Sequence, residues 1–206
     1  RKPNPYQCVP ASMLVSGSRP GESNKMDSIS WSLTRETASL LIGAAVLAPS
    51  SHNTQPWLFR VRSTRIDLLA DRTRALPVND PYDRELTISC SCALFNLRVA
   101  AAHANLAATR YGPFDPTDPD CLAALELAPA TAPDTVLAPL FEAMATRRTY
   151  RKTFSAHPVA ASVLASLAEV ASQEGAWLHL LDSAEQRMQA VELVAEGDEM
   201  HILPIP

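Results

Sequence analysis

The stretch Ala-Pro-Ser-Ser-His-Asn-Thr-Gln-Pro-Trp, residues 48–57, separates two sequence patterns and decides how the early chain folds. Before it, apolar side chains in residues 33–48 recur at three- and four-residue spacing, which predicts a helix that Pro49 ends. After it, residues 58–62 and 66–70 are short strand-like runs on either side of a turn, which predicts a β-hairpin. The stretch itself is too polar for a core and is stiffened by its prolines.

Composition limits the class of protein. The chain has 206 residues, 47% of them apolar and 19% charged, which is typical of a globular protein. Its net charge of −4 gives no reason to expect nucleic acid or an anionic membrane as a partner. The longest strongly apolar run, Leu40–Ala48, is far shorter than the roughly 20 residues that cross a bilayer. Four cysteines without zinc-type spacing indicate free thiols and a cytoplasmic protein.

The patterning predicts a leader followed by two units. Residues 1–30 are rich in Pro, Ser, Gly and Asn and are expected to be a disordered leader. The first unit covers residues 31–143, where the segment 84–108 is apolar nearly all round and predicts a buried central helix. The second unit covers residues 144–206 and is expected to be truncated. Further expected elements are a strand over 121–127, helices over 136–145 and 159–172, a strand over 177–181, and a last helix from a Ser183–Gln186 capping box to about 197.

Two polar segments could carry chemistry. The stretch 48–57 offers hydroxyls, an imidazole and two amides, which together could hydrogen-bond a planar heterocycle. The segment Arg-Arg-Thr-Tyr-Arg-Lys-Thr-Phe, residues 147–154, has four positive charges and no acid in a net negative chain. Guanidinium groups with a neighbouring hydroxyl suit a phosphate. From composition alone, a polar turn and a solvated basic turn remain open alternatives.

Together, the two segments resemble the hallmarks of the nitroreductase superfamily of FMN-dependent oxidoreductases. The first resembles the APSxxNxQPW signature, and the second resembles an RRSxRxF-type phosphate segment, here in reversed order. That order is similar to the Acg family, in which two nitroreductase-like halves are fused. The resemblance implies an α+β, three-layer sandwich with a mixed, mostly antiparallel sheet and a buried central helix. It also implies one FMN between the two units, in a pseudo-dimer within the full chain or in a homodimer.

The resemblance assigns residues and an activity. Four residues would line the isoalloxazine ring: Ser50, Ser51, Asn53 and Gln55. Four would hold the phosphate and ribityl end: Arg147, Arg148, Thr149 and Arg151. The implied function is hydride transfer from NAD(P)H through FMN to a small-molecule acceptor such as a nitroaromatic or a quinone, with no catalytic side chain and no metal assigned. A flavin-sequestering or stress-related pseudo-enzyme is the alternative, and a domain that binds no flavin is a more distant one.

Overall fold

The computed structural model describes residues 14–16, 31–112 and 118–202. Backbone contacts divide the chain into two compact units, Arg1–Thr149 and Tyr150–Pro206. Each unit is described by itself below. The predicted start of the second unit, residue 144, lies inside the last helix of the first compact unit.

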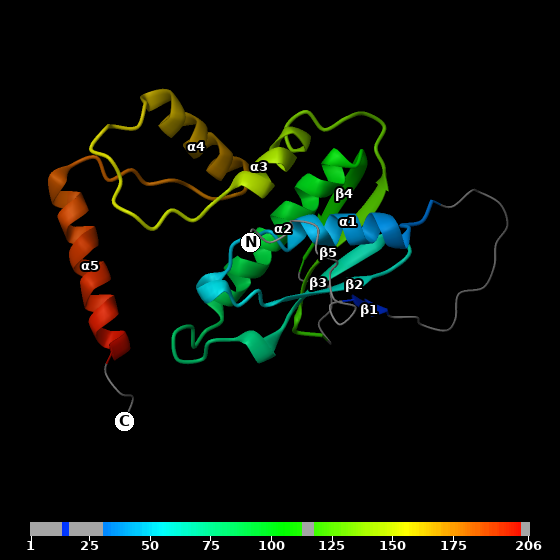
Figure 1. Cartoon of the computed structure of the whole chain (residues 1–206), viewed down its shortest axis with the longest axis horizontal. Helices are drawn as coiled ribbons and strands as arrows, with labels where there is room; N and C mark the ends of the chain where they lie inside the picture. The colour runs from blue at the N-terminus through cyan, green and yellow to red at the C-terminus, as the bar shows by residue number, and fades with distance from the viewer. Residues whose placement is uncertain (1–13, 17–30, 113–117, 203–206) are drawn as a thin grey trace, which may run out of the picture. The chain divides into compact units, whose positions relative to one another are not determined.

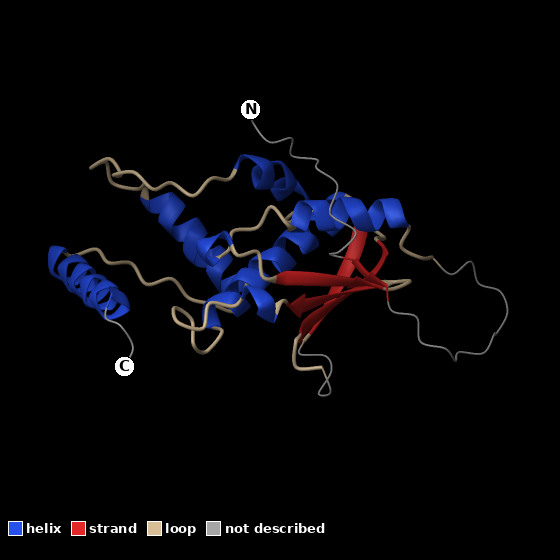
Figure 2. Ribbon diagram, turned by 60° about the horizontal axis from the view of Figure 1, so that its bottom comes forward, coloured by secondary structure: helices blue, strands red, loops and turns tan. Residues whose placement is uncertain are grey.

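Unit 1 is built on a five-stranded sheet (Figures 1 and 2). Its strands, in spatial order, are β1 (Leu14–Ser16), β2 (Trp57–Val61), β3 (Arg65–Ala70), β5 (Cys121–Pro129) and β4 (Leu106–Tyr111). The β1–β2 pair is parallel, and the other three pairs are antiparallel. The mixed, mostly antiparallel sheet and the hairpin predicted from the sequence are confirmed. Strand β1 lies within the predicted leader, and the rest of that leader is outside the described residues.

Two helices pack on this sheet and close one hydrophobic core. Helix α1 (Arg35–Ala45) begins at Thr34, whose hydroxyl accepts from the backbone N–H of Thr37 at 3.1 Å. Helix α2 (Arg84–His103) is the predicted central helix, with ten of its residues buried. It is long and apolar enough to cross a membrane, but 56% of its apolar window is buried inside the protein, as in the core helix of a globular fold. The core lies between the helices and alternate sheet positions: Leu41, Ile42, Trp57, Phe59, Ile66, Leu68, Ala93, Leu97, Leu125 and Leu127.

The chain around β4 corrects the sequence prediction. The central helix was expected to reach residue 108, but it ends at His103. Asn105 takes a left-handed conformation, with φ of 57°, and β4 follows directly. Asparagine tolerates this conformation better than most residues, so one residue turns the chain despite the helix-favouring alanines nearby in the sequence.

Unit 2 contains two helices, α4 (Ala161–Gln173) and α5 (Ala184–Ile202). The capping box is confirmed, because Gln186 N donates to Ser183 Oγ at 3.1 Å and Ser183 N donates to Gln186 Oε1 at 3.3 Å. The strand predicted over 177–181 is wrong, since this segment has no regular structure. A strand needs a hydrogen-bonding neighbour, and the described part of unit 2 contains none. None of its residues with an assigned burial is buried, and α4 exposes Val163, Leu167 and Val170.

A buried carboxylate joins three arginines on the sheet. Asp67 on β3 is 1% exposed. Its Oδ2 accepts from Arg62 Nε at 3.0 Å, its Oδ1 forms an ion pair with Arg65 Nε at 2.7 Å, and Arg60 Nη1 lies 3.7 Å from Oδ2. Removing the carboxylate would leave these guanidinium groups, each less than a third exposed, without their shared partner.

We expect Asp67→Ala to lower the free energy of unfolding by about 2–3 kcal/mol, because it removes the buried carboxylate that three partly buried guanidinium groups share. Urea unfolding followed by circular dichroism measures this change. Glu142→Ala removes an exposed carboxylate of unit 1 and is the control, expected to change stability by less than about 0.5 kcal/mol. Equal stability of the two variants would contradict the role given to Asp67.

Asp80 holds the start of α2. Its carboxylate accepts from Arg84 N at 2.8 Å and from Leu86 N at 2.9 Å, so it satisfies helix N–H groups that have no partner within the helix. Burial alone would raise the pKa of Asp80, but hydrogen bonds from the backbone of Leu86, Glu85 and Arg84 outweigh it and hold the pKa below 3.8.

We expect Asp80→Asn to lower the melting temperature by a few degrees at neutral pH. The folded-state pKa is depressed, so this stabilisation is present above the unfolded-state pKa and is lost as pH falls through the folded-state value. The gap between the melting temperatures of wild type and variant should therefore narrow in acid. A gap that stays constant from neutral pH to about pH 3 would contradict the assignment.

Candidate functional site

The polar loop between α1 and β2 has an unusual backbone. Residues Ser51–Asn53 form a single 3-10 turn, η2. His52, Asn53 and Gln55 have φ values of 48°, 58° and 51°, although none of them is glycine. Residues with a Cβ rarely adopt this left-handed backbone conformation. Non-glycine residues that are held in it occur preferentially at functional sites.

Hydrogen bonds inside the loop maintain this backbone. The N–H of Gln55 donates to Ser50 Oγ at 3.0 Å, and the N–H of Asn53 donates to Ser50 O at 3.1 Å. Thr54 donates to Ser51 O through both its backbone N–H, at 3.0 Å, and its hydroxyl, at 2.9 Å. Ser50 and Ser51 are therefore part of the loop's own framework.

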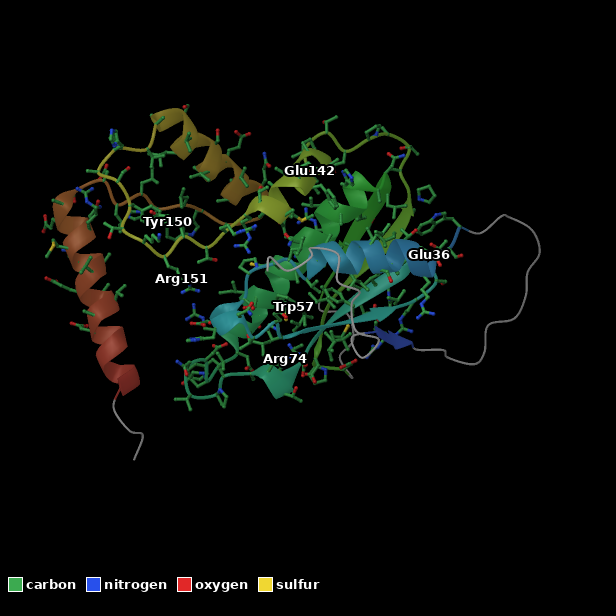
Figure 3. All side chains as sticks on the ribbon, in the orientation of Figure 1. Glu36, Trp57, Arg74, Glu142, Tyr150 and Arg151 are labelled. Atoms are coloured by element: carbon green, nitrogen blue, oxygen red, sulfur yellow. The ribbon has the colours of Figure 1, made fainter. Side chains whose placement is uncertain are left out.

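Two neighbouring segments hold the loop from outside. On the α2 side, the N–H of Ser51 donates to Ser89 Oγ at 3.1 Å, and the hydroxyl of Ser51 donates to the carboxylate of Glu85. On the other side, Arg74 at the end of η3 (Arg72–Arg74) donates to Thr54 O at 3.1 Å. Arg74 and the buried Trp57, which follows the loop, are both labelled in Figure 3.

The loop and α2 together border a shallow hollow of about 250 Å³. Its lining residues are Pro49, Ser50, Ser51, Glu85, Ile88, Ser89 and Cys92. The side chains of His52 and Asn53 are exposed, and within the described residues they make no hydrogen bond. The loop thus combines a fixed backbone with polar side chains that are available to a ligand.

Part of the basic segment lies beside the start of this loop. Helix α3 (Phe141–Thr146) is anchored by Phe141, whose ring stacks on His103 with centroids 3.9 Å apart. Just after α3, Arg147 Nη2 lies 3.4 Å from Leu47 O, its acceptor. Burial raises the pKa of the Cys92 thiol, and the positive charge of Arg147 opposes that rise. The guanidinium of Arg147 therefore places a positive charge near the start of the loop and near Cys92, which lines the hollow.

Of the other predicted phosphate ligands, Thr149 lies beside Arg147, whose Nη1 donates to Thr149 Oγ1 at 3.5 Å. Arg148 Nη1 donates to Ala145 O at 2.9 Å and to Arg147 O at 2.8 Å, so it closes the C-terminal end of α3. Thr149 is exposed and ends unit 1. Arg151 is exposed in unit 2, in the segment that precedes α4, where Figure 3 labels it with Tyr150. A guanidinium has five N–H donors, so Arg147 and Arg148 retain donors for a phosphate.

Two proteins of Mycobacterium tuberculosis that carry the name "Putative NAD(P)H nitroreductase" are similar to this chain. One, Rv3131, is 37% identical over 165 residues, which make up 80% of this chain and 47% of the relative. The other, acg, is 33% identical over 98 residues, which make up 48% of this chain and 30% of the relative. The chain belongs to the nitroreductase superfamily.

The matches differ in how much of each protein they cover. This nitroreductase-superfamily chain spans about half the length of Rv3131. Among solved structures, a "putative nitroreductase in complex with fmn" from Desulfovibrio desulfuricans matches 60% of this chain and 88% of its own, with 18% identity and a TM-score of 0.42. No protein-family model matches the chain.

Sequence reasoning missed the residues of α2 that complete the nitroreductase-like loop. Glu85, Ile88, Ser89 and Cys92 all line the hollow, and their spacing of three, four and seven residues places them on one helix face. That spacing was visible in the sequence. The helix was interpreted only as a buried core element, so its polar side chains received no role.

Burial raises the pKa of two further cysteine thiols in this chain. Desolvation raises the pKa of Cys90 to about 12, and the Cys90 thiol donates to Pro56 O at 3.1 Å. Burial raises the pKa of Cys121 as well. Among the described residues, no group of three or more His, Cys, Asp or Glu side chains could hold a metal ion.

We expect Cys90 to resist a thiol reagent such as iodoacetamide in the folded protein at pH 8, because almost none of it is thiolate at that pH. Mass spectrometry of peptides from native and urea-unfolded protein measures the labelling. Cys92 should react earlier than Cys90, since it is only half-buried. Labelling of Cys90 before Cys92 in native protein would contradict the structure.

Proposed function

We propose that the chain is the flavin-binding part of an FMN-dependent NAD(P)H oxidoreductase of nitroreductase type. The observation that carries the proposal is the loop at residues 50–55, whose backbone is held by hydrogen bonds, with exposed polar side chains at His52 and Asn53 and with Arg147 beside its start. The relatives named as NAD(P)H nitroreductases support the same assignment. The acceptor is proposed to be a small molecule such as a nitroaromatic or a quinone.

The residues present suit FMN chemically. A flavin ring carries carbonyl and N–H groups along one edge, which hydroxyl and amide side chains can pair. Ser50 and Ser51 border the hollow, while Asn53 and Gln55 are fixed in the same loop by their left-handed backbone. The dianionic phosphate suits the guanidinium groups and hydroxyl of Arg147, Arg148, Thr149 and Arg151.

When bound, FMN would supply two-electron chemistry by accepting a hydride from NAD(P)H and passing it to an acceptor. The protein's part is binding and orientation. The loop's ties to α2 and to Arg74 fix its hydrogen-bonding groups before any ligand arrives, so little rearrangement is needed on binding. The arginines neutralise the phosphate and hold that end of the cofactor in place.

We expect Arg148→Ala and Arg151→Ala each to weaken FMN binding by about 10- to 100-fold, because each removes a charge-assisted contact worth about 1.5–3 kcal/mol. Quenching of flavin fluorescence on titration with protein measures the dissociation constant. Arg35→Ala removes an exposed arginine at the start of α1 and is the matched control, expected to bind FMN as wild type does.

Unchanged FMN affinity in both variants would remove the phosphate assignment. Reduction of the bound FMN by NADH or NADPH, followed by the loss of flavin absorbance under anaerobic conditions, tests the oxidoreductase itself. Bound flavin that neither nucleotide reduces would indicate a flavin-sequestering protein instead. Wild-type protein that binds no FMN would overturn the proposed function.

A further inference from the structure

Ser50 and Ser51 are neighbours in the loop and both border the hollow, but they use their hydroxyl groups in opposite ways. A serine hydroxyl has one proton to donate and two lone pairs that accept. Which of these remains for a ligand depends on the bond that the protein has already made. The two serines therefore differ in what they can offer.

Both hydrogen-bond donors of Ser51, its hydroxyl and its backbone N–H, are bonded to residues of α2. Its hydroxyl donates to the carboxylate of Glu85, and its backbone N–H donates to Ser89 Oγ at 3.1 Å. Ser89 in turn donates its own proton to Glu85 O at 2.7 Å, so its oxygen is fixed as an acceptor for Ser51. A carboxylate can only accept, so the Ser51 proton cannot point elsewhere while Glu85 is ionised. What Ser51 offers the hollow is an acceptor.

Ser50 is the reverse case. Its oxygen accepts the N–H of Gln55 at 3.0 Å, within a backbone that the left-handed Gln55 fixes. Among the described residues, its hydroxyl proton has no acceptor. Ser50 therefore offers the hollow a donor. The two side chains together present a donor next to an acceptor.

We propose that Glu85 is a positioning residue that sets this polarity, and that the serine pair recognises a carbonyl next to an N–H on the pyrimidine edge of FMN. Ser50 donates to the flavin carbonyl, and Ser51 accepts from the flavin N3–H. This inference rests on the proposed function, because it names the part of FMN that the loop recognises. Glu85 itself acts through Ser51 and is assigned no contact with the flavin.

The side chain at residue 85 decides whether Ser51 can offer the ligand only an acceptor or also a donor. A glutamine has the same shape, but its amide can either accept from Ser51 or donate to it. Ser51 in Glu85→Gln can then turn its proton toward the ligand, so the pair no longer distinguishes an N–H from a group that lacks one. Glu36, labelled in Figure 3, provides a matched control, since it is an exposed glutamate in the first turn of α1. Glu85 is likewise an exposed glutamate in the first turn of α2.

The experiment compares FMN with N3-methyl-FMN, in which the N–H is replaced, by fluorescence titration of the full 206-residue chain. Wild type and Glu36→Gln should prefer FMN by about tenfold or more, because a site built to pair an N–H rejects an analogue that lacks it. Glu85→Gln and Ser51→Ala should lose most of that preference. Ser50→Ala should weaken both ligands alike and keep the preference, since both retain the carbonyl.

Three results would overturn the inference. Equal affinity of the wild type for the two flavins would show that no N–H is recognised. A preference that survives in Glu85→Gln would show that the methyl group is rejected by its size, independently of Glu85. Wild type that binds neither flavin would overturn the inference together with the proposed function, which separates that case from the other two. Thermal melts of each variant show that the loss is not one of folding.

Discussion

The packing of α2 against the sheet is the constraint on which the rest of unit 1 depends. Its buried face is made largely of small and medium residues, such as Ala93, Leu97 and Ala101, which let the helix lie close to the strands. Asp80 fixes where that helix begins. Together, the buried face and the starting point bring Glu85 and Ser89 to the loop that ends at Trp57. The core and the candidate site are therefore set by the same helix.

Local patterns allowed much of the fold to be predicted from the sequence. The hairpin and α1 follow from periodicity, and the polar stretch between them was recognisable because residues 48–57 fit neither pattern. Two failures have a physical origin. A single left-handed asparagine, Asn105, ended α2 where the alanines favoured continuation, and the segment 177–181 has no neighbouring strand in the part of the chain that the structure describes.

The candidate site was harder to predict, because its ties are long-range. Ser51 contacts residues 34 and 38 positions further along the chain, and Arg147 lies 100 positions beyond its acceptor Leu47. Sequence motifs indicate which side chains could meet a ligand. They do not show which hydroxyl already donates and which already accepts, since this depends on partners that only the folded chain brings close.

The left-handed residues of the loop have a consequence for how a ligand would associate. His52, Asn53 and Gln55 are held in the left-handed region of φ/ψ space by the folded protein. The packing of the core offsets the conformational free energy that this requires, before any ligand binds. A loop in this condition is closer to a rigid template than to a segment that closes around its ligand. Its encounter with a cofactor would then be limited by diffusion and orientation, and selectivity would come from how poorly the fixed loop adapts to an ill-fitting molecule.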